Sequence, residues 1–297
     1  MNVFVTGATG FIGSQVVREL LSAGHQVLGL ARSDAGAKFL LDAGAKAHRG
    51  DLEDLESLRS GAKLSDGVIH LGFNHDFSKF AANCEMDKNA IEALGAVLVG
   101  SDRPLLVTGG LLFLAPGRTA TEEDAHPPVS SSFPRASEMA AMALASQGVR
   151  AAVVRLPQVH DPVKQGLVTF LINIAREKGV SAYVGDGLNR WAAAHVLDTA
   201  HLYRLALEKA TAGAKYHAVT EEGVPLRDIA EVIGRGLKVP VVSMSREEAA
   251  QHFGFLAFFA GIDGPASSAL TQERLGWRPT NRPGLIADLD HASAFKG

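Results

Sequence analysis

Short apolar or β-branched runs alternate with longer helix-patterned segments over the first 155 residues of the chain. This alternation is typical of parallel strands joined by crossover helices, so it predicts an α/β sheet. Six strands in this order suit a doubly wound Rossmann sheet with helices on both faces, whose ligand lies outside the carboxyl ends of the strands. The predicted strands are Asn2–Thr6, Gln26–Ala31, Ala45–His48, Gly67–Leu71, Pro104–Thr108 and Arg150–Leu156, and the predicted helices are Phe11–Ser22, Ala35–Leu41, Asp54–Arg59, Cys84–Val99 and Ser137–Ser146.

The regular alternation fades after Pro157, where smaller elements follow. We expect a Rossmann domain over residues 1–157 and, over residues 158–297, mainly a smaller α+β lobe that binds substrate. Because no repeat or long linker separates the two, some later segments can return to the first sheet. The predicted elements of this region are helices Gln165–Lys178, Asp198–Lys209 and Pro225–Gly236 and strands Val180–Val184, Tyr216–Val219 and Pro240–Ser243.

Charge and composition narrow the function classes. The chain has 29 Lys and Arg against 32 Asp and Glu, and these charges are interspersed, which argues against a nucleic-acid or anionic-membrane partner. Gly, Pro or charge interrupts every apolar stretch before the roughly 18 residues of a membrane span. A single cysteine, Cys84, and the lack of a basic leader favour the cytoplasm. The 11 histidines form no ligand-spaced pair on a helix, so we expect no metal site.

The strongest motif is a glycine-rich turn between the first predicted strand and the first predicted helix. Its glycines permit a tight turn and close approach of the backbone to a pyrophosphate, while the helix N-terminus offers free N–H groups. A purely structural turn is the alternative. The turn therefore predicts a dinucleotide site built from Gly7, Thr9, Gly10, Phe11, Ile12 and Gly13.

The end of the second strand bears on the choice of cofactor. A dinucleotide fold that prefers NAD usually places a carboxylate there, but this chain has Arg32 and Ser33. Arg32 can pair with a 2′-phosphate and Ser33 can donate to it, which favours NADP over NAD. A solvated arginine is the alternative. After the third strand, we expect Asp51 and Leu52 to meet the adenine ring, with helix capping as the other role for Asp51.

Further segments occur in a familiar order: Asp51-Leu52, Val68-Ile69-His70-Leu71, Val153-Val154-Arg155-Leu156-Pro157 and His195-Val196-Leu197-Asp198. With the glycine motif, they resemble the extended and atypical short-chain dehydrogenase/reductase families, the NAD(P)-dependent epimerase/dehydratase group, over nearly the whole chain. The resemblance implies a nicotinamide cofactor and a substrate carbonyl or alcohol in a cleft between the two domains. We assign to the cofactor site, in addition, Leu71, Gly72, Thr108, Pro157 and Val159.

The chain departs from this family in its catalytic residues. Such enzymes use a Tyr-x-x-x-Lys pair after the fifth strand, in which the Lys lowers the pKa of the Tyr, and a Ser or Thr that holds the substrate oxygen. None of the three tyrosines, Tyr183, Tyr203 and Tyr216, is followed four places later by Lys. The hydroxyl position after the fifth strand reads Thr108-Gly109-Gly110, so both elements are lost or replaced.

Three other residues are candidates for the missing chemistry. His75 follows the fourth strand and can act as a proton donor, because histidine titrates near neutral pH. Ser131, in the Ser130–Ser132 run, offers a hydroxyl, and Arg135 offers the positive charge of the absent Lys. The alternatives are an ordinary loop for the serines and a surface position for the arginine.

Several later residues have both a structural and a functional interpretation. His160 and His195 are more typical of structural hydrogen bonds than of catalysis, Asp198 of a helix cap, and Trp191 can form a wall for substrate. The phenylalanines of an aromatic-rich segment can form an apolar lid, a core or a homodimer face. These are Phe253, Phe255, Phe258 and Phe259.

These features together predict an NADP-dependent oxidoreductase. It would transfer a hydride between nicotinamide and a carbonyl or imine-like carbon of a small apolar substrate, because this chemistry belongs to the cofactor and needs mainly orientation and exclusion of water. The alternatives are an NADP-sensing binding protein that has lost catalysis, and an epimerase or dehydratase of the nucleotide-sugar type.

Overall fold

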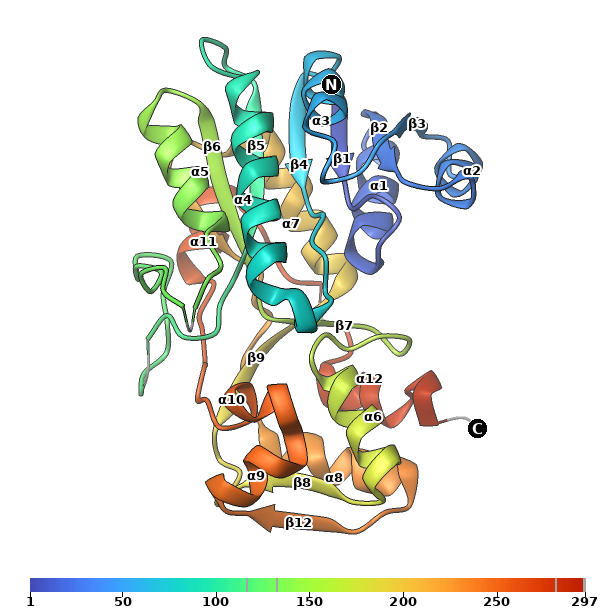
Figure 1. Ribbon diagram of the computed structural model, residues 1–297, viewed down its shortest axis with the longest axis vertical. Helices are drawn as coiled ribbons and strands as arrows, with labels where there is room; N and C mark the ends of the chain where they lie inside the picture. Colours follow the sequence, from blue (N-terminus) through green and yellow to red (C-terminus); the bar gives the residue numbers. More distant parts are fainter. Residues whose placement is uncertain (116, 132, 281, 296–297) are drawn as a thin grey trace.

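The computed structural model describes residues 1–115, 117–131, 133–280 and 282–295. Its largest element is a parallel sheet of seven strands in the order β10-β6-β5-β4-β1-β2-β3 (Figure 1). The predicted doubly wound sheet is confirmed, with one strand more than the sequence predicts. The strands are β1 Asn2–Thr6, β2 Gln26–Ala31, β3 Lys46–Arg49, β4 Gly67–His70, β5 Pro104–Gly110, β6 Arg150–Leu156 and β10 Lys215–His217.

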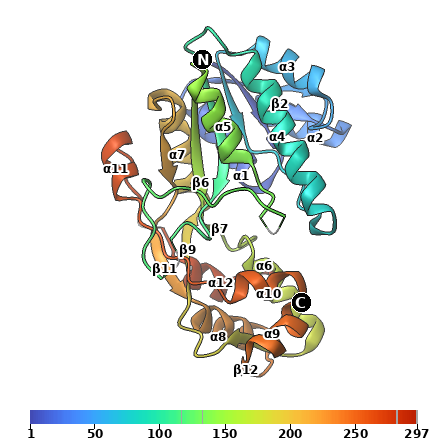
Figure 2. The same cartoon turned by 60° about the vertical axis from the view of Figure 1, so that its left-hand side comes forward.

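Helices cover both faces of this sheet, and each face has its own apolar core. One core joins α1 to α7 through Val16, Leu20, Leu202 and Leu207. The other joins α3, α4 and α5. Helix α11 lies against α7 at the β10 edge (Figure 2). The helices are α1 Phe11–Ser22, α2 Asp34–Asp42, α3 Leu55–Lys63, α4 Phe80–Ala96, α5 Ser137–Ser146, α7 Val196–Lys209 and α11 Ala269–Leu275.

The remaining elements form a smaller body below the sheet in Figure 1, which we call the small lobe. Its core includes Val168, Trp191, Ile229 and Phe253. It contains a three-stranded sheet in the order β11-β9-β7 and a parallel pair of strands, β12 and β8. The strands are β7 Gln158–His160, β8 Ser181–Val184, β9 Arg190–His195, β11 Glu221–Pro225 and β12 Val241–Met244. The helices are α6 Val168–Lys178, α8 Leu226–Leu237, α9 Arg246–Phe253, α10 Ala257–Ala260 and α12 Leu285–Asp290, with 3-10 turns η2 Gly254–Leu256 and η3 Ser293–Phe295. A further 3-10 turn, η1 Phe77–Lys79, lies outside the small lobe, between β4 and α4.

Two predictions for the second half of the chain need correction. The strand predicted at Tyr216–Val219 spans Lys215–His217 instead, and it pairs with β6 as one of the later segments that return to the first sheet. The helix predicted at Asp198–Lys209 begins at Val196, because the side chain of His195 accepts the N–H of Leu197 and caps it. Asp198 is therefore not the cap: its carboxylate accepts the backbone N–H and the hydroxyl of Thr280.

Some predicted bounds near the sheet also shift. Helix α4 begins at Phe80 rather than Cys84, because the turn η1 leads directly into it and Asp76 caps that turn. Helix α3 begins one residue after the predicted Asp54, which is its cap, and continues to Lys63. Strand β3 begins at Lys46, not Ala45, and α6 begins at Val168, not Gln165.

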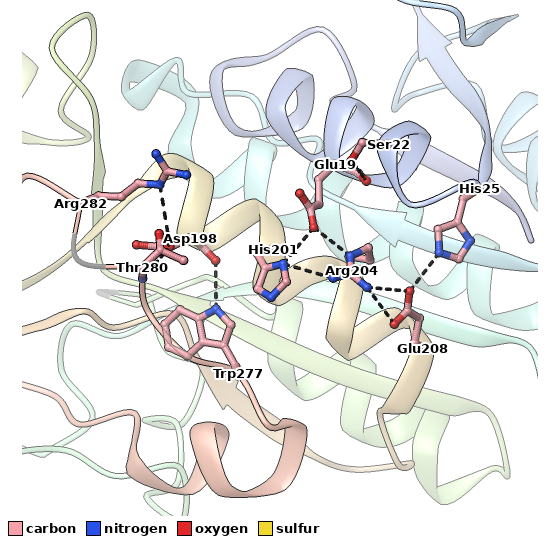
Figure 3. A network of polar contacts seen from close by, with 10 residues as sticks. All are labelled: Glu19, Ser22, His25, Asp198, His201, Arg204, Glu208, Trp277, Thr280 and Arg282. Carbon is pink, nitrogen blue, oxygen red and sulfur yellow. Dashed lines mark hydrogen bonds and ion pairs between the residues drawn. The ribbon is translucent and has the colours of Figure 1, made fainter.

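A polar network fastens α7 to α1 (Figure 3). Glu19 of α1 accepts hydrogen bonds from His201 at 2.9 Å and from Arg204 at 2.8 Å. Burial raises the pKa of Glu19, but the bonds and charges of these two partners outweigh it and hold the pKa below its usual value. Near the start of α7, Trp277 donates its indole N–H to the backbone oxygen of Asp198. The network therefore ties α7, which follows β9 of the small lobe, to the first helix after the glycine-rich turn. No helix in the described ranges is long and apolar enough to cross a membrane.

Candidate functional site

The glycine-rich turn after β1 forms a cradle that side chains would fill. Gly7 has a φ of +65°, and a Cβ there would lie 2.8 Å from Gly72 N. A Cβ on Gly13 would lie 2.0 Å from Gly7 O, so α1 can approach β1 this closely only with glycine. The N–H groups of the first turn of α1, which begins at Phe11, have no acceptor within the helix. This geometry fits the diphosphate of a dinucleotide.

Leu52, one of the two residues predicted to meet the adenine ring, lies beside the glycine cradle. Leu52 lies over Gly72, because a Cβ on that glycine would be 2.9 Å from Leu52 Cδ2. Asp51 Oδ1 accepts the N–H groups of Glu53 and Asp54 at 2.9 and 3.0 Å, which closes the turn before α3. Helix capping was the alternative role predicted for Asp51. Asp51 orders the turn that leads into α3, but the N-cap of α3 is Asp54.

The residues at the end of β2 are exposed. Ser33 is the N-cap of α2 and accepts the N–H of Gly36 at 3.1 Å, so its oxygen has a structural role. Arg32 forms no ion pair with any residue of the described ranges. Its guanidinium is therefore free to meet an anion at the edge of the cradle, and its role toward a 2′-phosphate stays a prediction.

A chain of buried hydrogen bonds runs beneath the cradle. His70 Nε2 donates to Asp87 Oδ1 at 3.1 Å, because a carboxylate oxygen only accepts. On the other side of the ring, His70 Nδ1 lies 2.9 Å from the Thr6 hydroxyl, which also accepts the N–H of Gly72 at 3.1 Å. Ser137 donates its hydroxyl to the other Asp87 oxygen at 2.5 Å. Asp87 of α4 thus fixes the ends of β1 and β4 and the start of α5.

Arg135 is held at the end of this chain. Its Nε donates to Ser137 Oγ at 3.0 Å and its Nη2 to Thr108 O at 3.3 Å. The guanidinium carbon lies 4.6 Å from the ring centre of Phe73, in the loop after β4. Burial raises the pKa of Asp87, but His70, Arg135 and Ser137 together hold it below its usual value. The alternative that Arg135 is a solvated helix-surface residue is therefore wrong, because it is half-buried between β4 and β5.

Thr108 and Tyr203 do not offer hydroxyls to a substrate. Thr108 Oγ1 donates to His70 O at 2.7 Å and accepts from Tyr203 OH at 2.7 Å. Burial raises the pKa of Tyr203, so its phenol stays protonated. In the segment Thr108-Gly109-Gly110, where the family has its hydroxyl, a Cβ on Gly110 would meet nothing within 4 Å. A hydroxyl-bearing side chain would therefore fit there, but the chain has none.

His75 lies beside the same group, and Ser131 lies farther along the chain. The His75 ring is exposed and packs against Phe73 at 5.2 Å between ring centres. Partial desolvation, followed by the charges of Arg135 and Lys164, lowers the pKa of His75. Ser131 is exposed in a turn that Ser130 and Phe133 close by mutual backbone hydrogen bonds. Ser132 of the same run lies outside the described residues.

Two clusters of aromatic rings join the main sheet to the small lobe. After β4, Phe77 stacks on Phe255 at 4.8 Å and meets Phe170 of α6 at 5.8 Å. After β5, Phe113 stacks on Phe258 at 4.9 Å and meets Phe133 at 5.2 Å. The segment of η2 and α10 therefore touches both loops at the carboxyl ends of the strands. Phe255 is 48% exposed and Phe258 is 57% exposed, whereas Phe253 is in the lobe core.

Other candidates have structural roles. Trp191 is fully buried in the lobe core and so forms no wall for substrate. His160 is buried and hydrogen-bonds Asp288 of α12 through Nδ1 at 2.7 Å. Val159 is also buried, and Pro157 joins β6 to β7, between the sheet and the lobe. Burial raises the pKa of Cys84 to about 11, which leaves an inert thiol. The described residues contain no group of His, Cys, Asp and Glu that could hold a metal ion.

His70, Asp87 and Ser137 are buried in this site and were not predicted as site residues from the sequence. A polar residue within the apolar run Val68-Ile69-His70-Leu71 was the available signal, because buried polar side chains need partners. Nothing in the sequence alone brings Asp87 and Ser137 to the same place.

Comparison with known proteins places this geometry in a family. The model of the NAD dependent epimerase/dehydratase family matches residues 3–220. An uncharacterized protein of Schizosaccharomyces pombe is 50% identical over 99% of this chain and 100% of its own. A 2-alkyl-3-oxoalkanoate reductase of Stenotrophomonas maltophilia is 28% identical, over 82% of this chain and 77% of its own.

A solved structure of a dTDP-glucose 4,6-dehydratase double mutant from Streptomyces venezuelae, with NAD bound, has the same fold. It matches with a TM-score of 0.76 and 19% identity, over 99% of this chain and 96% of that chain. Binding of NAD or NADP is typical of the matched family. The chain therefore belongs to the NAD dependent epimerase/dehydratase family, within the extended short-chain dehydrogenase/reductases that its motifs resemble.

Proposed function

We propose that this protein is an NADP-dependent oxidoreductase that transfers a hydride between nicotinamide and a carbonyl or imine-like carbon of a small apolar substrate. The observation that carries the proposal is the meeting of the glycine cradle, Arg135 and the aromatic residues Phe73 and Phe77 at the carboxyl ends of β1, β4 and β5. The similarity to a reductase of an oxoalkanoate supports the same reaction class.

The chain's own residues supply binding and orientation. The cradle from Gly7 to Gly13 would hold the diphosphate, Leu52 and Leu71 would border the adenine half, and Arg32 would pair with the 2′-phosphate. When bound, the cofactor supplies the hydride, which the protein itself cannot provide. The aromatic residues of the two clusters would exclude water from the reacting carbon.

Arg135 is the residue that we assign to the substrate oxygen. Its guanidinium is fixed by Ser137 and Thr108, so it is preorganised to stabilise negative charge on that oxygen. The lowered pKa of His75 keeps its imidazole neutral at pH 7, which weakens its case as an acid but leaves its N–H as a hydrogen-bond donor. The proton would then reach the oxygen from water or from Ser131, with His75 orienting the donor.

Arg32 gives the proposal a direct test. We expect Arg32→Gln to weaken binding of NADPH by about tenfold or more, the loss of one charge-assisted contact, and to change binding of NADH less than about twofold. Calorimetric titration of both cofactors into both proteins measures this, with Arg18→Gln on the outer part of α1 as control. Oxidation of the preferred cofactor is then followed with a panel of aldehydes, ketones and imines. Equal affinity for both cofactors would contradict the NADP assignment.

One observation favours a second candidate, an NADP-sensing binding protein without catalysis. The hydroxyls of Thr108 and Tyr203 are engaged in the core, and Gly110 leaves the usual hydroxyl position empty. Tight binding of NADPH with no oxidation across the panel would favour the sensor. Consumption of NADPH would favour the enzyme. An epimerase or dehydratase would instead convert a nucleotide sugar with no net change in the cofactor.

A further inference from the structure

The segment between β7 and α6 holds Lys164 in a fixed turn. Asp161 Oδ1 accepts the N–H groups of Val163 and Lys164 at 2.7 and 2.9 Å, and Asp161 N donates to Lys164 O at 2.9 Å. Gln165 adds a bond from its side-chain amide to Asp161 O at 2.8 Å. The backbone of Lys164 is therefore ordered by hydrogen bonds on both its sides, although its side chain is exposed.

One ring contact locates the Lys164 ammonium. It lies 6.0 Å from the ring centre of Phe11, the first residue of α1 after the glycine cradle. Its charge also contributes to lowering the pKa of His75, in the loop after β4. The ammonium thus lies beside the first residue of α1, close enough to the loop after β4 for its charge to act on His75.

No carboxylate of the described residues lies within ion-pair distance of this ammonium. Asp161, the acid of its own turn, has Oδ1 occupied by backbone N–H groups. Of the other charges that act on the pKa of the shared neighbour His75, Arg135 is also positive and its effect is larger than the opposite effect of Asp87. The electrostatic potential here is therefore positive at a place where the cradle already offers free N–H groups, which favours an anion.

We propose that Lys164 binds the diphosphate of the dinucleotide from the small-lobe side, opposite the N–H groups of α1. The inference rests on the proposed function, because it needs a dinucleotide in the cradle. It adds that the cofactor is held by both parts of the molecule, so that binding of the diphosphate draws the segment after β7 onto the glycine turn. Phosphate is the anion for which a lysine serves well as a point charge.

The test compares ligands with and without a diphosphate. 2′-Phospho-ADP-ribose contains the diphosphate, and adenosine 2′-monophosphate contains the adenine and the 2′-phosphate only. We expect Lys164→Ala to weaken binding of the first by about tenfold and of the second by less than about twofold. Lys164→Arg should restore most of the loss. Lys63→Ala, which removes the same charge at an exposed position on α3, should change neither.

Each outcome separates the two claims. If the wild-type protein binds 2′-phospho-ADP-ribose and Lys164→Ala binds it equally well, the inference is wrong and the proposed function stands. If Lys164→Ala weakens binding of both ligands equally, the lysine only attracts anions in general. The proposed contact with the diphosphate is then wrong as well. If the wild-type protein binds neither ligand, nor NADPH nor NADH, the proposed function fails and the inference with it. Hydrogen exchange of residues 161–167 gives a second readout, and it should slow when the diphosphate ligand binds the wild-type protein.

Discussion

At the scale of single residues, the buried side chains of Arg155 and His217 each have hydrogen-bond partners for their nitrogen atoms. Arg155 of β6 is fully buried and pairs with Glu138 of α5 at 2.6 Å. It also donates to His217 Nε2 at 3.1 Å, while His217 Nδ1 donates to Ser267 O at 2.8 Å. His217 therefore has a fixed neutral tautomer with both nitrogens engaged. A proton added at Nε2 would face the Arg155 guanidinium.

This arrangement predicts acid sensitivity. Burial, joined by the charge of Arg155, lowers the pKa of His217 to about 3, although the bond to Ser267 O acts in the opposite direction. In the unfolded chain the pKa is about 6.5, so the unfolded state binds the additional proton between these values. The neutral His217 therefore contributes its full share to the free energy of unfolding above about pH 6.5. This contribution is lost as the pH falls toward 3, at up to about 1.4 kcal/mol per pH unit.

Urea unfolding at several pH values checks this prediction. Between about pH 6.5 and pH 4, the free energy of unfolding should fall less steeply for His217→Gln than for the wild-type protein. His291→Gln, at an exposed position, should leave the slope unchanged. Parallel slopes for the wild-type protein and His217→Gln would show that another group causes the acid loss.

At the scale of elements, the contact between η1 and η2 joins the loop after β4 to the small lobe. The rings of Phe77 and Phe255 stack with centres 4.8 Å apart and planes at 22°. Their stacking should contribute about 0.5–1.5 kcal/mol beyond burial of area. We therefore expect a double-mutant cycle of Phe77→Ala and Phe255→Ala to give a coupling energy in this range.

The control cycle pairs Phe77→Ala with Phe258→Ala, since Phe258 stacks on Phe113 in the other cluster. Its coupling energy should be near zero, because the two residues share no ring contact. Urea unfolding of the single and double variants gives both energies. A zero coupling for Phe77 and Phe255 would mean that the small lobe does not rest on the loop after β4.

Elements with strong local signals could be predicted from the sequence, and their partners could not. Strands β1, β2 and β6 and helices α1 and α5 have the predicted bounds, because apolar periodicity and glycine at the turn decide them locally. The apolar pattern of Tyr216–Val219 predicted a strand, but not that it would pair with β6. In the candidate site the glycine turn was evident from its motif. The links from Asp87 to His70 and Ser137 were not, because they join residues 17 and 50 positions apart.

At the scale of the whole molecule, the chain combines a preserved nucleotide half with an altered catalytic edge. The cradle, the order of strands and the family match agree on a dinucleotide site. At the ends of β4 and β5, Arg135 and two aromatic clusters stand where the Tyr-x-x-x-Lys pair is missing. We therefore expect hydride transfer to proceed without a tyrosine as the proton donor.

The most direct measurement follows the hydride itself. NADPH that carries deuterium at both C4 positions of the nicotinamide is incubated with the protein and the carbonyl and imine panel, and the products are examined by mass spectrometry. We expect a product one mass unit heavier, with the deuterium on the former carbonyl or imine carbon. Arg135→Gln should form about a hundredfold less of it, the range for loss of one charge-stabilising donor. If the protein binds the cofactor but no product carries deuterium, or if Arg135→Gln makes as much product as the wild-type protein, the proposal of hydride transfer assisted by Arg135 is wrong.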